Sequence, residues 1–144
     1  LDVVAQASAL APMIRQLRDA GITVSAFVDA DQQQIRAAHS LGVEVCEVHT
    51  GPYADVFYAQ GRDPDRPLVR KALEELGLAG QEIQRLGMRF NAGHALNYFN
   101  VQPVAALEGV RELHIGHSIV SRAVLVGMRE AVREMKRLMR EAAR

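Results

Sequence analysis

The segment Arg89–Leu96, with the sequence RFNAGHAL, decides the interpretation of the whole chain. Its first half is typical of a short strand, and it then runs into a glycine followed by a histidine. The pattern returns in Leu113–Ser118, with the sequence LHIGHS. Because neighbouring parallel strands end at the same edge of a sheet, two strands that each end in Gly-His would place two tight turns and two imidazoles on one rim. The rest of the chain is then expected to be the scaffold of that rim.

The hydrophobic pattern along the chain predicts helices that alternate with strands. Strands are predicted at residues 22–29, 43–50, 88–94 and 110–116, and helices at residues 2–20, 35–41, 68–86, 100–107 and 121–143. A helix followed by four strand-helix units is typical of an α/β fold with a parallel sheet. The first predicted strand, ITVSAFVD, is almost continuously apolar, which favours burial of both its faces.

Local signals refine this outline. Asp31 with Gln34 three residues later predicts a capping box at the start of a helix. Thr50–Tyr53 is interpreted as a turn, and Gly61–Pro67, which is polar and contains two prolines, as a surface loop. The last predicted helix, residues 121–143, carries one apolar stripe along its length. That stripe consists of Val124, Met128, Ala131, Val132, Met135, Leu138 and Met139.

Two architectures fit four strand-helix units: a small open sheet, and half of an eight-stranded (β/α)8 barrel, the TIM barrel. The chain starts at Leu1, without a methionine, directly in a helical pattern, which suggests a piece of a longer polypeptide. Asp29, His49, His94 and His117 all fall at the carboxyl ends of predicted strands, where barrel enzymes have their active sites. An open sheet would also bind ligands at that edge. The two features together favour half a barrel.

Composition excludes several classes of protein. The chain has 144 residues, the size of one domain, and a hydrophobic fraction of 49%, which is ample for a core. Lys plus Arg and Asp plus Glu are both 17, so no basic excess points to nucleic acid. Cys46 is the single cysteine, which excludes a disulfide framework and fits a reducing compartment. We expect no membrane span, because no run of 18 apolar residues exists.

The two Gly-His turns carry the first candidate site residues. His94 is the best candidate for acid-base chemistry, because an imidazole titrates near neutral pH and the end of a strand holds it rigidly. Gly116 and His117 lie where a strand meets the last helix, and backbone N–H groups at a helix start favour a phosphate. A tight turn without a ligand, or a histidine hydrogen-bonded into the barrel mouth, would give the same pattern.

Glu47 is a carboxylate inside a strand that should be buried. Such a group needs a partner, so it is either a catalytic carboxylate or a structural ion pair, for which Arg89 of the next strand is a candidate. We expect His49 and His114 to be hydrogen-bonded structural residues and Asp29 to be a helix cap. The sequence lacks close metal-ligand spacing, so no metal is expected, and Cys46 is expected in the core.

The chain resembles the pyridoxine 5'-phosphate synthase family. The resemblance rests on motifs in the family's order and rough spacing, and it covers nearly the whole chain. The motifs are Phe27–Asp31 (FVDAD), Glu47–Ala54 (EVHTGPYA), Asn91–His94 (NAGH), Ile115–Val120 (IGHSIV) and Glu134–Met139 (EMKRLM). The loop from Val56 to Pro67 looks longer than the family pattern.

The resemblance implies a (β/α)8 TIM barrel, of which residues 1–144 would be the C-terminal half. The family condenses 1-deoxy-D-xylulose 5-phosphate with 3-amino-2-oxopropyl phosphate, and the products are pyridoxine 5'-phosphate, inorganic phosphate and water. The resemblance therefore implies a cytoplasmic transferase of vitamin B6 biosynthesis that needs no cofactor. It also implies a homo-octamer with no nucleic-acid or membrane partner. In the family the N-terminal half supplies further acid-base groups, so a chain of these residues alone is expected to be inactive.

By position, the resemblance implies specific roles. His94 matches the proton donor, and Glu47 matches a carboxylate that stabilises the transition state. Gly116 and His117 match residues that bind 3-amino-2-oxopropyl phosphate, as does Ala95, where the family usually has glycine. Two alternatives remain open at the level of sequence: a non-catalytic phosphate-binding α/β module, and another barrel enzyme that acts on a sugar phosphate.

Overall fold

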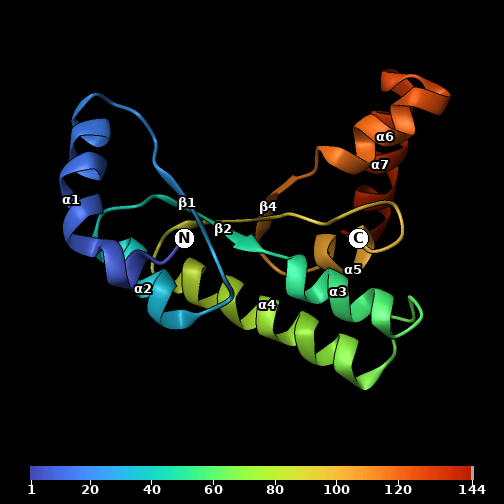
Figure 1. Cartoon of the computed structure of the whole chain (residues 1–144), viewed down its shortest axis with the longest axis horizontal. Helices are drawn as coiled ribbons and strands as arrows, with labels where there is room; N and C mark the ends of the chain where they lie inside the picture. The colour runs from blue at the N-terminus through green and yellow to red at the C-terminus, as the bar shows by residue number, and fades with distance from the viewer. Residues whose placement is uncertain (144) are drawn as a thin grey trace.

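A computed structural model describes residues 1–143, in which helices alternate with parallel strands (Figure 1). The elements are α1 Val3–Asp19, β1 Ser25–Val28, α2 Gln32–Ser40, β2 Val45–His49, α3 Gly51–Ala59, α4 Pro67–Arg85, β3 Arg89–Gly93, α5 Val101–Ala105, β4 Val110–His114, α6 His117–Val126 and α7 Met128–Ala142. The predicted alternation of helices with four strands is therefore confirmed, whereas α3 and the division between α6 and α7 were not predicted.

The described strands form one parallel sheet in the order β1-β2-β3-β4. Each strand pairs with the one before it in the chain, and the order does not reverse. A doubly wound open sheet reverses its strand order at a switch point, whereas a barrel adds each new strand on the same side. The α/β class is thus confirmed, with the strand order of half a (β/α)8 barrel.

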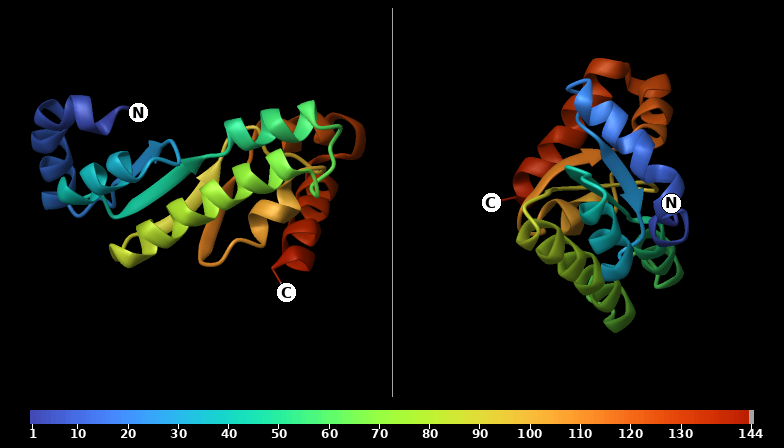
Figure 2. Two further views of the ribbon diagram at one scale, coloured as in Figure 1. Left: turned by 90° about the horizontal axis from the view of Figure 1, so that it is seen from below. Right: turned by 90° about the vertical axis from the view of Figure 1, so that its left-hand side faces the viewer.

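The helices described in residues 1–143 cover one face of this sheet and leave the other uncovered. α2 and α4 contact the strands, and α4 lies alongside them in the view from below (Figure 2, left). Val48 and Phe90 are buried between the sheet and these helices, together with Ile35 and Ile83. Each such side chain contributes about 1.5–3 kcal/mol through burial. Gly80 lies against the Phe90 ring, which a side chain at that position would overlap.

The uncovered face corrects one prediction. Along β1 the side chains alternate between exposed and buried, and Phe27 on the uncovered face is 39% exposed. The expectation that the first strand is buried on both faces is therefore wrong for these residues. An apolar run shows only that burial is tolerated on both sides, and here the described chain supplies helices for one side alone.

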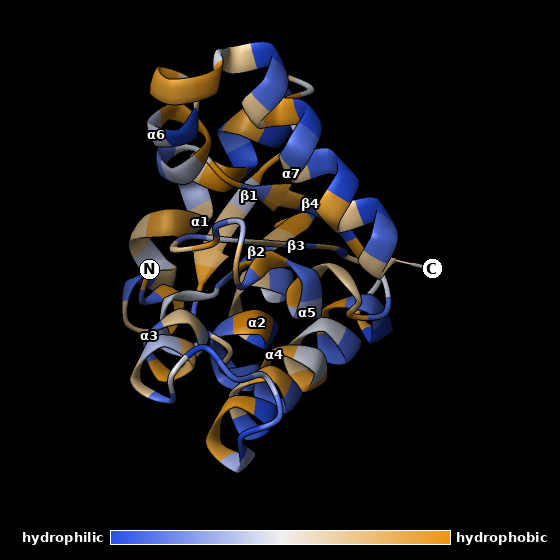
Figure 3. Ribbon diagram, turned by 90° about the vertical axis from the view of Figure 1, so that its right-hand side faces the viewer, coloured by the Kyte–Doolittle hydropathy of each residue, from blue (hydrophilic) through white to orange (hydrophobic). Residues whose placement is uncertain are grey.

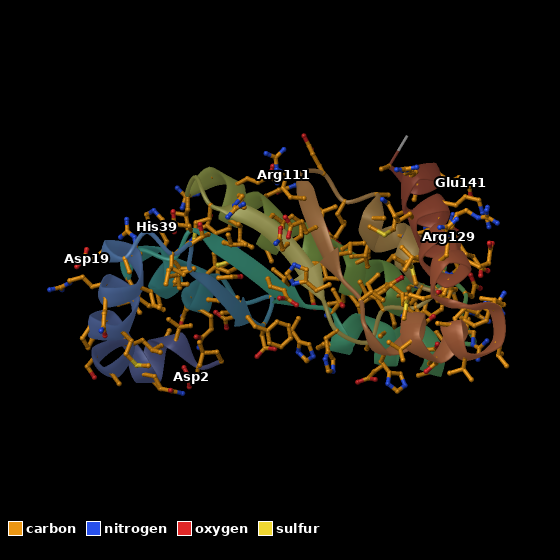
Figure 4. The ribbon with its side chains drawn as sticks, turned by 90° about the horizontal axis from the view of Figure 1, so that it is seen from above. Asp2, Asp19, His39, Arg111, Arg129 and Glu141 are labelled. Carbon is orange, nitrogen blue, oxygen red and sulfur yellow. The ribbon has the colours of Figure 1, made fainter. Side chains whose placement is uncertain are left out.

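The molecule is elongated, and its two ends differ (Figure 4). Asp19 and His39 lie at the end formed by α1 and α2, whereas Arg129 and Glu141 lie at the other end, on α7 (Figure 4). The carboxyl ends of β2, β3 and β4 lead into α3, the segment before α5, and α6, respectively. The candidate site is therefore expected between the sheet and the α6–α7 end.

The start of α2 confirms half of the capping box. The Asp31 carboxylate accepts hydrogen bonds from the backbone N–H groups of Gln33 and Gln34, at 2.6 and 3.1 Å. The Gln34 side chain does not return to the cap. Its oxygen instead accepts a bond from the backbone N–H of Val3 at 2.6 Å, which ties α1 to α2.

Two predictions of local structure were wrong. Thr50–Tyr53 is not a free turn, because residues 51–59 form α3, with a proline in its first turn. The predicted helix over residues 121–143 is two helices, because Gly127 has a φ of 82° and ends α6. Only the second part of the predicted stripe is packed, since Ala131 and Met135 are buried while Val124 and Met128 are exposed. Figure 3 shows hydrophobic residues on α6, of which Val120, Val124 and Leu125 are exposed.

None of the described helices is long and apolar enough to cross a membrane.

Candidate functional site

The residues predicted for catalysis and substrate binding meet at one cleft of about 650 Å³ at the carboxyl ends of β2, β3 and β4. It is lined by Phe27, Glu47, His94, Ala95, Leu96, Asn97, His114, Ile115, Gly116, His117 and Ser118. All the residues predicted from the sequence for catalysis or substrate binding are in this set. Phe27 and His114 also line the cleft, although the sequence did not predict a role for either in catalysis or binding.

Glu47 is held by a histidine of the fourth strand. Its Oε2 lies 2.6 Å from Nδ1 of His114, whose Nε2 lies 3.3 Å from Oε2 of Glu112. Desolvation lowers the pKa of His114, but the hydrogen bonds and charges of Glu47 and Glu112 outweigh it and raise this pKa above the usual value. Glu47 therefore faces a group that is readily protonated.

Arg89, the candidate partner for an ion pair with Glu47, is not the partner that the structure shows. In the β2–β3 register Glu47 pairs with Asn91, and Arg89 pairs with Val45 at the start of the strand. The Asn91 amide donates to Glu112 at 3.2 Å, while its side-chain oxygen is buried with no hydrogen-bond partner among the described residues. Strand register, which the sequence did not reveal, decides these pairs.

A glycine makes room for the Glu47 carboxylate. A Cβ on Gly93 would overlap Oε1 of Glu47 and would lie 3.0 Å from both Cβ and the carbonyl oxygen of His114. The glycine of the second Gly-His turn differs, because a Cβ on Gly116 would meet open space. The two turns look alike in sequence, yet only Gly93 is required by close packing.

His94 belongs to an aromatic cluster with His49 and Phe27. Its ring lies 4.9 Å from the His49 ring in an edge-to-face arrangement, and Phe27 lies 5.1 Å from His49 and 6.2 Å from His94. Nδ1 of His49 is 3.1 Å from a carboxylate oxygen of Asp29. Asp29 is therefore a partner of His49 rather than the expected helix cap, and His49 is hydrogen-bonded, as predicted. The His94 side chain is exposed to the cleft.

The second Gly-His turn leads directly into a helix. Gly116 precedes α6, and among residues 1–143 no side chain caps the start of that helix. Backbone N–H groups at such a start favour an anion, both by direct hydrogen bonding and through the helix dipole. The Ser118 hydroxyl donates to the Leu96 carbonyl at 2.9 Å, which links the two Gly-His turns.

The described part of the chain holds no group of three or more His, Cys, Asp or Glu side chains arranged to hold a metal ion. Cys46 is fully buried, and burial raises the pKa of its thiol to about 11. A thiol in that state is a poor nucleophile. The chemistry available at the cleft is thus that of imidazoles, a carboxylate and backbone N–H groups.

These features define a class: a section of a barrel-type α/β protein with imidazoles, a carboxylate and an uncapped helix start on its C-terminal rim. The family model of the pyridoxal phosphate biosynthesis protein PdxJ matches residues 1–141. The chain belongs to this family.

Curated relatives agree with the family assignment. A pyridoxine 5'-phosphate synthase of Dechloromonas aromatica is 63% identical over 143 residues, which are 99% of this chain and 57% of the relative. Proteins of the same name from an Azoarcus strain and from Aromatoleum aromaticum are 61% and 59% identical over the same shares. The chain therefore spans little more than half the length of the relatives it matches.

Proposed function

We propose that residues 1–144 are the C-terminal part of a single (β/α)8 barrel domain of a pyridoxine 5'-phosphate synthase. The enzyme would condense 1-deoxy-D-xylulose 5-phosphate with 3-amino-2-oxopropyl phosphate to give pyridoxine 5'-phosphate, inorganic phosphate and water. The observation that carries the proposal is the meeting of His94, Glu47 and the Gly116–His117 helix start at one cleft, in a chain of this family.

The chemistry of the reaction fits these groups. Ring closure with loss of water requires proton transfer near neutral pH, and we assign proton donation to His94. Glu47, kept in place by His114, would stabilise positive charge that develops on the nitrogen-bearing intermediate. Charge stabilisation of this kind needs a carboxylate whose position does not change during the reaction, which the 2.6 Å contact with His114 favours.

Phosphate binding is assigned to the loops beside these groups. Gly116 and His117 would hold the phosphate of 3-amino-2-oxopropyl phosphate at the start of α6, and Ala95 would contribute from the neighbouring turn. Anchoring a small substrate by its phosphate holds its reacting carbon close to the acid-base groups, which can supply several kcal/mol of the rate acceleration.

The uncovered face of the sheet supports the barrel. Phe27, Glu47 and Asn91 lie side by side across this face, which points inward in a closed barrel. In a barrel the remaining strands would cover them and pair with the free edges of β1 and β4. Residues 1–144 alone would then lack half of the acid-base groups, and we expect them to be inactive by themselves.

Assembly and location belong to the same proposal. The exposed apolar residues Val120, Val124 and Leu125 of α6 support a homo-oligomer in which they are covered (Figure 3). An octamer is the state that the family resemblance implies. A cytoplasmic location fits the single cysteine, which is a free, buried thiol.

The test is an assay of the complete polypeptide in which this chain occurs. With both phosphorylated substrates we expect pyridoxine 5'-phosphate to form, and with either one alone we expect none. His117→Ala should raise KM for 3-amino-2-oxopropyl phosphate more than tenfold and leave KM for the xylulose phosphate nearly unchanged. Binding of both phosphates without product would contradict the proposal and favour the non-catalytic phosphate-binding module.

A further inference from the structure

The turn that carries His94 has an unusual backbone. His94 has a φ of 79° and Ala95 has a φ of 58°, so two consecutive residues with side chains adopt the left-handed conformation. This conformation costs about 1–2 kcal/mol for each such residue. Strain of this kind persists only where the surroundings hold the backbone, and it gathers at functional sites.

Thr50 holds the first half of this turn. It is fully buried, and its hydroxyl lies 2.7 Å from the carbonyl oxygen of Gly93 and 2.5 Å from that of His94. Its backbone N–H donates to the Gly93 carbonyl as well, at 2.9 Å. One threonine on the neighbouring strand end thus contacts both carbonyls that flank the left-handed His94.

Asn100 holds the second half. It is also fully buried, and its amide nitrogen donates to the Ala95 carbonyl at 3.1 Å. Its amide oxygen accepts a bond from the backbone N–H of Asn97 at 2.7 Å, and its own carbonyl accepts one from the Tyr53 hydroxyl at 3.0 Å. The three consecutive carbonyls of residues 93, 94 and 95 therefore all lie within hydrogen-bond distance of a buried side-chain donor, and the single hydroxyl hydrogen of Thr50 serves the first two.

We propose that Thr50 and Asn100 are positioning residues that hold the left-handed turn at His94 and so aim its imidazole into the cleft, an inference that rests on the proposed function of His94. The His94 side chain is exposed and is held on one side only, by the His49 and Phe27 rings, so its direction depends strongly on its backbone. The described residues that line the cleft include neither Thr50 nor Asn100, which therefore act through the turn and not on a substrate.

A relaxed turn would change catalysis more than binding. If residues 94 and 95 returned to negative φ, the imidazole would leave its place beside His49, and a displacement of about 1 Å can cost on the order of a hundredfold in rate. The Gly116–His117 helix start belongs to another strand end and would remain. We call the hydrogen bonds from Thr50 and Asn100 to this turn the clamp. Its loss should lower kcat far more than it raises KM for 3-amino-2-oxopropyl phosphate, to which Ala95 contributes, and should leave KM for the xylulose phosphate nearly unchanged.

The experiment compares Thr50→Val, which keeps the branched shape and removes the hydroxyl, with Thr50→Ser, which keeps the hydroxyl. Thr23→Val is the matched control, because Thr23 is exposed at the opposite end of the sheet. In the complete polypeptide we expect Thr50→Val to lower kcat about tenfold to a hundredfold, with KM values within about threefold. Thr50→Ser should recover most of kcat, and Thr23→Val should match the wild type.

A second measurement does not depend on activity. Crystal structures of the wild type and of Thr50→Val would report φ at residues 94 and 95, and Asn100→Asp, which keeps the acceptor and removes the donor, provides a second variant. We expect Thr50→Val to lose positive φ at His94, and Asn100→Asp to lose it at Ala95. If either variant does not crystallise, the NMR signals of the His94 imidazole should shift in it and remain in Thr50→Ser.

The outcomes separate the two proposals. A wild-type polypeptide without product formation would contradict the proposed function, and the φ values would still test the clamp. Unchanged φ and unchanged kcat in Thr50→Val would overturn the clamp while the proposed function stands. Equal losses in Thr50→Val and Thr50→Ser would also overturn it, because the hydroxyl would then not be the group that matters.

Discussion

The two ends of the strands differ in which residues adopt the left-handed backbone conformation. We call the side of the sheet where the strands begin the glycine edge, and the side where they end the site edge. At the edge where helices lead into strands, the left-handed positions belong to Gly21, Gly42, Gly87 and Gly109, with φ between 74° and 88°. At the opposite edge, where strands lead into the site, the left-handed positions are His94 and Ala95. Glycine adopts this conformation without strain, and residues with side chains do not.

This difference suggests that the glycine edge contributes to stability and the opposite edge to function. The glycine edge also has a cleft, of about 600 Å³, lined by polar residues that include Arg15, Arg18 and His39. Its turns end helices at little energetic cost, as expected of the edge of a barrel that contributes to stability. At the other edge, Thr50 and Asn100 hold a strained turn in place. Such a turn is expected at a site that depends on the direction of one side chain. Changes at each edge should therefore have different consequences.

The largest difference in kcat between the two edges should come from substituting a histidine at each. His94→Gln in the complete polypeptide should lower kcat about 10²- to 10⁴-fold, because glutamine keeps a polar side chain but cannot transfer the proton. His39→Gln, an exposed histidine at the glycine edge, is the matched control and should leave kcat unchanged. Steady-state kinetics with both substrates provides the measurement. Equal rates for the two variants would remove the proposed role of His94.

A glycine-edge substitution should act on stability alone. In Gly87→Ala, the added Cβ would meet open space, so the effect isolates the backbone at φ 79°. We expect the free energy of unfolding to fall by about 1–2 kcal/mol, with kcat within twofold of wild type. Urea unfolding of the complete polypeptide gives the first quantity. A loss of activity without a loss of stability would contradict the division between the edges.

The converse substitution at the site edge should stabilise the protein. Ala95→Gly relieves a left-handed alanine at φ 58°, but the glycine also loses more conformational entropy on folding. The net gain in the free energy of unfolding should be about 0.5–1 kcal/mol, smaller than the loss in Gly87→Ala and opposite in sign. Urea midpoints of the two variants, measured together, test both signs. Destabilisation by Ala95→Gly would show that Ala95 is not strained.

The smallest effect concerns protonation inside the cleft. Since the folded-state pKa of His114 is raised above its unfolded value, its interactions with Glu47 and Glu112 stabilise the fold fully below about pH 6.5 and are lost as the pH rises through the raised pKa. Glu47→Gln should lower the pKa of His114 and flatten this part of the stability curve. An NMR titration of the His114 imidazole measures the shift. An unchanged titration would mean that Glu47 is not the partner that raises it.

Prediction from the sequence succeeded where a signal is local and repeated along the chain. Apolar periodicity placed the strands to within a few residues, and the two Gly-His patterns placed His94 and His117 on one rim. It failed where a local pattern has two outcomes. The apolar stripe of residues 121–143 continues through Gly127, yet the helix breaks there, because a glycine can adopt a φ of 82° when packing favours a bend. α3 was missed because glycine and proline suit both a turn and a first helical turn.

The sequence by itself determined the order of the elements, the parallel sheet and the edge at which the polar groups gather, because these follow from chain order and from which residues avoid water. Only the tertiary structure decided which groups meet across that edge. Because of the strand register, Glu47 is hydrogen-bonded to His114 and is not paired with Arg89. The register also places the Thr50 hydroxyl against the turn at His94. Contacts between strands distant in sequence depend on distances of a few ångströms, which periodicity does not encode.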